Sequence, residues 1–163
     1  MAASKQTPLL YLETSVFGFC FDQKPYNAPR RQAADLLFRQ IEDGLFQAVT
    51  SPLTTRELNR AAEPLRSQML ELLKRVEMLT VDPDAAERLA QAYIAEGVIP
   101  ADFADDARHA AFASIAGADV LVSMNLRHLA NEWAERRLNT VNLRERYRLI
   151  GVRTPEEVLS YED

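Results

Sequence analysis

Three acidic side chains occupy positions from which they could act together on one metal ion. Glu13 follows the apolar run LLYL, Glu57 lies in the segment after a second apolar run, and Asp106 begins a helix-like stretch of small residues. Neighbouring carboxylates repel one another, which raises their affinity for protons and cations. Mg²⁺ takes about six oxygen ligands, usually from a few carboxylates, water and substrate phosphate. The residue types therefore indicate the chemistry of a hard divalent cation.

Each acid also has a simpler structural interpretation, and for Glu13 it is a helix-start residue or a solvated turn residue. Glu57 could be a solvated helix residue that pairs with Arg60 at i+3. Asp105 and Asp106 could cap the helix that they begin, where the helix dipole favours negative charge. Since one acid suffices for a cap, the second is free for another role. Asn125, immediately after the run VLVSM, could ligate a hard ion, position a water or cap the following turn.

Imidazole and basic side chains stand close to these acids in the sequence. His109 lies on an apolar helix and is better interpreted as a packed residue hydrogen-bonded to backbone than as a general base. His128 is interpreted as a helix-entry residue, whereas Arg127 is the better candidate for a phosphate contact. The arginines between residues 132 and 148 alternate with glutamates, which favours a solvated face and leaves RNA-backbone binding as the alternative.

The segments that carry these residues alternate between strand and helix patterns. This alternation predicts right-handed crossovers and a three-layer α/β/α fold with a central, mostly parallel five-stranded sheet. We expect one such domain over residues 8–163, after a flexible N-terminus at residues 1–7. Ligands bind at the carboxyl ends of strands in such sheets, where Glu13 and Asn125 would lie. Strands are predicted for residues 9–12, 46–51, 77–82, 119–125 and 148–152, and helices for 28–43, 51–62, 64–76, 82–97, 105–118, 128–145 and 154–159.

The composition is that of a globular protein with its own core. The 163 residues are 47% hydrophobic and 26% charged, and the single cysteine, Cys20, cannot form an internal disulfide. No apolar run approaches the ~20 residues of a membrane span, and the start MAASKQT is too short and polar for a signal peptide, so we expect a cytoplasmic protein. The net charge of -5 disfavours strong nonspecific nucleic-acid binding. A nucleic acid could still be a substrate if metal ions neutralised the acids.

Four motifs in a fixed order carry a family resemblance. They are LYLETSVFG, TSPLTTREL, DDARHAAFASIAGADVLVSMNLRHLAN and RLIGVRTPEEVL, which together span nearly the whole chain. The most specific part is D-A-x-H-x-A leading to VLVS-x-N-x-RH, together with the acid-Thr-Ser after the first strand. In this order the chain resembles the PIN domain, the fold of VapC-like toxins and related metal-dependent ribonucleases.

The resemblance implies an endoribonuclease that uses Mg²⁺ or Mn²⁺ to hydrolyse RNA phosphodiester bonds. Glu13, Glu57 and Asp106 match the three acids that hold the metal in the family, although the first is more often Asp. Asn125 stands where many members have a fourth acid, and we expect this neutral residue to weaken a second metal site more than the first. The side chains implied to contact substrate are Thr14 or Ser15, beside the first acid, and Arg127.

The resemblance also implies partners. We expect a homodimer, with the apolar helices at residues 33–41 and 65–76 as candidate surfaces, and a possible antitoxin protein as the partner of a type II toxin. An alternative is a catalytically weak or inactive module that binds RNA or protein through the same fold. Glu13, Asn125 and the acidic net charge favour that alternative.

Overall fold

The chain forms a three-layer α/β/α fold around a five-stranded sheet in which every neighbouring pair of strands is parallel. The computed structural model describes residues 6–159. The strands are β1 (Leu9–Leu12), β2 (Gln47–Thr50), β3 (Glu77–Met78), β4 (Val120–Val122) and β5 (Gly151–Arg153). The helices are α1 (Thr14–Phe19), α2 (Ala28–Glu42), α3 (Pro52–Leu58), α4 (Leu65–Leu73), α5 (Pro83–Ala95), α6 (Ala104–Ile115), α7 (Glu132–Arg144) and α8 (Pro155–Leu159), with short 3₁₀ turns at Pro25–Asn27 and Ala101–Phe103. The predicted fold class is confirmed.

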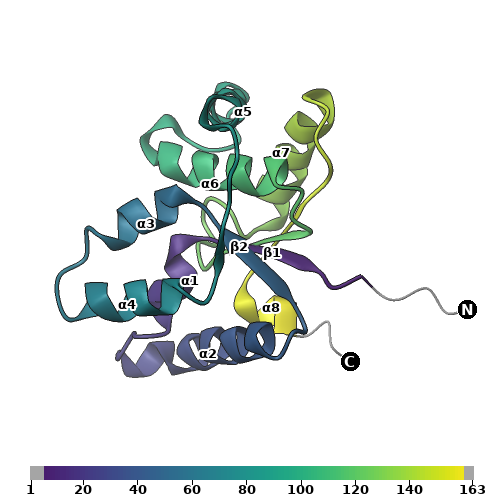
Figure 1. The fold of residues 1–163 in the computed structure, drawn as a ribbon. Coiled ribbons are helices and arrows are strands. Elements are labelled where there is room, and N and C mark those ends of the chain that lie inside the picture. Colours follow the sequence, from purple (N-terminus) through teal and green to yellow (C-terminus); the bar gives the residue numbers. More distant parts are fainter. Residues whose placement is uncertain (1–5, 160–163) are drawn as a thin grey trace, which may run out of the picture.

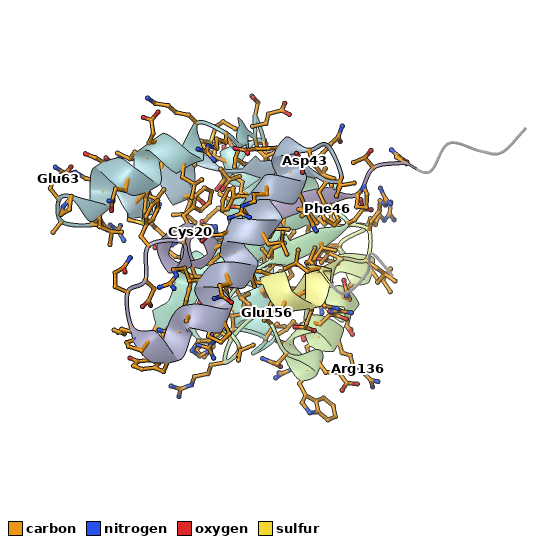
Figure 2. All side chains as sticks on the ribbon, turned by 90° about the horizontal axis from the view of Figure 1, so that it is seen from below. Cys20, Asp43, Phe46, Glu63, Arg136 and Glu156 are labelled. Atoms are coloured by element: carbon orange, nitrogen blue, oxygen red, sulfur yellow. The ribbon has the colours of Figure 1, made fainter. Side chains whose placement is uncertain are left out.

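Alternate side chains of β1 supply two separate cores. Tyr11 points into the layer of α5, α6 and α7, where it packs in one cluster with Tyr93. Leu10 and Leu12 point to the other face and pack in a cluster with Phe17 of α1 and Leu37 of α2. Figure 1 shows these two helical layers on opposite sides of the sheet, and Figure 2, seen from below, shows α2 crossing the second layer with α8 beside it. β1 is therefore buried on both faces and lies in the middle of the sheet.

The strand order β3-β2-β1-β4-β5 changes winding direction at β1. The chain builds outward from β1 through β2 to β3, and then crosses back to place β4 on the other side of β1. Side chains that follow β1 and β4 consequently face each other at the switch point, where open α/β sheets bind ligands. This topology is what brings distant acids to one edge.

Several elements differ from the sequence-based expectation: the helix expected over residues 51–62 ends at Leu58, and the strands expected over 119–125 and 148–152 span Val120–Val122 and Gly151–Arg153. The third strand, expected over residues 77–82, ends at Met78, because Leu79 N–H makes the last bond to Thr50 O at 2.8 Å before Asp82 and Pro83 begin α5. The helix expected from residue 128 begins at Glu132, because the side chain of Asn131 caps it by accepting from Ala134 N–H at 2.9 Å. Helix α1, which the sequence patterns do not predict, is short and begins immediately after Glu13.

The described part of the chain begins at residue 6 and ends at residue 159. The expected flexible segment, residues 1–7, falls mostly outside the described residues, as do residues 160–163 of the expected domain. Within residues 6–159 no helix combines the length and the apolar character needed to cross a membrane.

Candidate active site

The predicted acids lie together at the carboxyl edge of the sheet. Glu13 follows β1, Glu57 lies near the end of α3, and Asp106 lies in the first turn of α6. Thr14, which follows Glu13, donates a hydrogen bond to Glu57 at 3.2 Å, and Asn125 beyond β4 donates one to Asp106 at 3.0 Å. The negative charges of Glu13 and Glu57 both act on Asp106. Four separate segments thus converge on one site.

Glu13 is buried and held by two hydroxyl groups. The residue is only 6% exposed, and its Oε2 accepts from Ser15 at 2.5 Å and from Ser123 at 2.9 Å. Both serines are fixed in turn, because Met124 N–H donates to Ser15 Oγ and Asn125 N–H donates to Ser123 Oγ, each at 2.9 Å. The loop after β4 therefore orients the carboxylate that follows β1.

Glu57 is held by a chain of buried polar side chains. Its Oε1 accepts from Thr14 and from Nε2 of His109, a residue with no exposed surface. Because a carboxylate only accepts, Nε2 donates to Glu57, and Nδ1 of the same ring lies 2.8 Å from the Tyr11 oxygen. Ser51 lies 2.7 Å from the same Tyr11 oxygen. Burial raises the pKa of Tyr11, so its hydroxyl remains a proton donor.

Several simpler interpretations are wrong. Glu57 does not pair with Arg60, whose guanidinium instead lies 4.0 Å from Asp105. His109 bonds to side chains rather than to backbone. Asp105 and Asp106 do not cap α6, because the helix already begins at Ala104 and both acids lie inside its first turn.

The hydroxyl side chains at two helix starts bind other side chains instead of capping the helices. Ser51 is the residue before α3, but its side chain makes no capping bond and instead contacts Tyr11. Thr14 and Ser15 likewise do not cap α1, because their hydroxyls bind Glu57 and Glu13. In this structure Thr14 and Ser15 position acids, and a contact of either with substrate stays a prediction.

The pKa of Asp106 is raised by its surroundings. Burial, and then the charges of Glu13 and Glu57, raise the pKa of Asp106 from 3.8 to about 6, although the charge of His109 and the bond from Asn125 partly offset this. The Asn125 amide is used on both sides, because its nitrogen donates to Asp106 and its oxygen accepts from His128 N–H at 3.0 Å. In this arrangement Asn125 caps the turn after β4 and does not present its oxygen to a metal.

The donor set fits a hard cation, but it does not form a closed cage. Each carboxylate of Glu13, Glu57 and Asp106 uses one oxygen for hydrogen bonds and keeps the other without a partner within residues 6–159. In the same range none of the three pairs with Lys or Arg. No three acidic, His or Cys side chains of the described chain converge closely enough to enclose an ion. The site therefore offers oxygen and charge, and a cation would have to draw the carboxylates together.

Sequence reasoning missed two features of this site. Ser123 follows β4 as part of an apolar run, and nothing in its sequence context separates it from an ordinary strand-end residue. Phe103 and His128 stack at the margin of the site, with ring centroids 4.0 Å apart and planes inclined by 31°. Phe103 is 43% exposed, and burial together with Arg127 lowers the pKa of His128, which favours its neutral ring.

A groove and several arginines lie around the elements that carry the acids. A groove of about 840 Å³ lies beside α3 and α5, lined among others by Arg56, Leu79 and Arg108, but none of the three acids lines it. Of the arginines in the region 132–148, Arg136 and Arg144 pair with Glu132 and Glu96, as expected for a solvated face. Arg127 is exposed next to the aromatic pair.

Comparison with known proteins supports the fold. No family model and no curated protein sequence matches the chain. A chain in the structure of VapBC2 from Rickettsia felis, bound to a DNA fragment from its promoter, is similar with a TM-score of 0.53 and 13% sequence identity. The alignment covers 90% of this chain and 98% of that chain. At this identity the likeness is one of fold.

The raised pKa of Asp106 predicts a pH-dependent effect of Asp106→Asn on stability. The folded state binds the Asp106 proton more tightly than the unfolded state, so its stabilising contribution is complete below pH 3.8 and is lost as the pH rises through about 6. With EDTA present at pH 7.5, Asp106→Asn should raise the free energy of unfolding by about 1 kcal/mol, after allowance for solvent screening. The gain should vanish near pH 4 in thermal unfolding. Asp105→Asn, which removes an ion pair to Arg108 in the same turn, should give no gain at pH 7.5; equal gains from both variants would contradict the account.

Proposed function

We propose that this chain is a PIN-type, metal-dependent endoribonuclease, with the toxin of a toxin–antitoxin pair as its biological role. The observation that carries the proposal is the convergence of Glu13, Glu57 and Asp106 at the switch point of a parallel sheet, without a Lys or Arg partner in the described chain. The fold similarity to a VapBC2 chain supports it.

Each side chain of the site has a proposed task. Glu13, Glu57 and Asp106 would hold Mg²⁺ or Mn²⁺ through their unpaired oxygens. When bound, the ion would polarise the phosphate, neutralise developing charge and lower the pKa of a water. Ser15 and Ser123 keep Glu13 in place, and His109 with Thr14 does the same for Glu57. Arg127 is proposed to contact an RNA phosphate.

Partners follow from the same proposal. The similar chain comes from a structure of VapBC2 bound to promoter DNA, and on that basis an antitoxin is the proposed protein partner of this chain. A homodimer is proposed from the family resemblance, with helices α2 and α4 as candidate surfaces.

RNA cleavage tests the proposed activity. With Mg²⁺ or Mn²⁺, the wild-type chain should cleave single-stranded RNA, and both Glu13→Gln and Asp106→Asn should reduce the rate by a factor of about 100 or more, because each removes a carboxylate from the site. Asp105→Asn is the matched control. Asp105 forms an ion pair with Arg108, so this substitution should leave cleavage nearly unchanged. Cleavage that persists in Asp106→Asn, or that is independent of metal, would reject the assignment.

A second candidate function has one specific observation in its favour. The Asn125 amide turns its nitrogen to Asp106, so the position of a fourth ligand presents a donor instead of an oxygen. This favours a weakly active or inactive module that binds RNA or protein through the same fold.

Substitution of Asn125 separates the two candidates. Asn125→Asp should tighten Mn²⁺ binding about tenfold, roughly 1.4 kcal/mol, because it adds a carboxylate beside Asp106. Isothermal titration measures the affinity, and Gln68→Glu, an exposed residue of α4, adds the same charge away from the site. A wild-type chain without metal-dependent cleavage that gains it through Asn125→Asp would support the inactive module. Unchanged affinity and rate in Asn125→Asp would reject the proposed effect of this position.

A further inference from the structure

We infer that the stacked pair of Phe103 and His128 is a nucleobase platform, and that the substrate of the site is single-stranded RNA with a base stacked on Phe103. This inference rests on the proposed function, because it concerns the substrate of the same site. The ring centroids of the pair lie 4.0 Å apart and their planes are tilted by 31°, so the two rings are in direct contact. An aromatic ring held in this way can take a nucleobase on its exposed surface.

The exposure of Phe103 is the first reason to assign a ligand. His128 covers one side of the ring, and the residue nevertheless remains 43% exposed. The 3₁₀ turn Ala101–Phe103 leads directly into α6, so Phe103 is anchored on backbone of defined geometry. An aromatic ring that is anchored by the backbone and exposed to solvent is what a base needs for stacking.

The position of the pair relative to the acids is the second reason. Phe103 lies three residues before Asp106 in the same segment. His128 is tied to the other side of the site, because its N–H donates to Asn125, whose amide donates to Asp106. A base on Phe103 would thus place its sugar–phosphate backbone next to the acidic edge. Arg127, exposed beside His128, offers that backbone a positive charge.

The overall charge of the chain is the third reason. With a net charge of -5, the protein has little general attraction for a polyanion. Affinity for RNA must then come from local sources, and stacking on an aromatic ring is one that does not depend on net charge. Stacking also requires an unpaired base, because the faces of bases inside a duplex are already covered. The platform therefore favours single strands over duplexes.

Binding measurements with base-containing and base-free strands test the inference. A Glu13→Gln background with Mg²⁺ keeps the strand intact, and fluorescence anisotropy reports its affinity for a labelled oligoribonucleotide and for an abasic ribose-phosphate oligomer of equal length. Phe103→Ala should weaken binding of the base-containing strand about tenfold and leave the abasic strand unaffected. Phe103→Trp should restore binding, and His128→Ala should weaken it in the same selective way. Leu45→Ala, a residue 49% exposed on another surface, should change neither affinity.

Two outcomes would overturn the inference. The first is an unchanged affinity of Phe103→Ala for the base-containing strand, and the second is an equal loss for both strands, which would point to a protein partner or a structural role for the ring. Failure of the proposed function looks different. If base-containing strands bind through Phe103 but the wild-type chain never cleaves them with Mg²⁺ or Mn²⁺, the platform stands and the nuclease assignment falls. If cleavage depends on Asp106 but not on Phe103, the nuclease stands and the platform falls.

Discussion

The mutual repulsion of Glu13, Glu57 and Asp106 is the constraint around which this edge of the fold is built. The three carboxylates share a partly buried site, and the pKa of Asp106 is raised to about 6 by burial and by the other two charges. Asp105, next to Asp106, shows the contrast, because it is neutralised by Arg108 at 2.8 Å. The chain thus pairs the adjacent acid and leaves the three acids of the site without a Lys or Arg partner within residues 6–159. Uncompensated charge costs stability, and strongly shifted pKa values of this kind cluster at functional sites of proteins.

Hydrogen bonds from side chains other than Lys and Arg hold these carboxylates in place. Serine hydroxyls orient Glu13, the Asn125 amide orients Asp106, and His109 with Thr14 orients Glu57. The parallel sheet supplies the frame, because its winding switches at β1 and brings the segments after β1 and β4 face to face. One oxygen of each carboxylate is already held by hydrogen bonds. A cation could then bind the other oxygen of each carboxylate. Preorganisation of this kind lowers the entropic cost of binding.

The sequence was sufficient to predict the fold, but not the environment of the candidate acids at the edge of the sheet. Alternating strand and helix patterns predict a parallel sheet, and the parallel sheet then predicts that residues after its strands share an edge, as Glu13 and Asn125 do. The partners of His109 could not be predicted, since Tyr11 lies 98 residues away and Glu57 lies 52 residues away along the chain. Such contacts depend on how α6 sits on the sheet, which local patterns do not encode. The same holds for Ser123 on Glu13 and for the Phe103–His128 stack.

Stability as a function of Mn²⁺ concentration tests the central claim most directly. If the three carboxylates form a cation site, Mn²⁺ at about 100 times its dissociation constant should stabilise the wild-type chain by about 2.7 kcal/mol at pH 7.5. The midpoint of thermal unfolding should then rise by several degrees, and Glu13→Gln should lose most of this rise. A wild-type midpoint that does not respond to Mn²⁺, or one that rises equally in Glu13→Gln, would contradict the account.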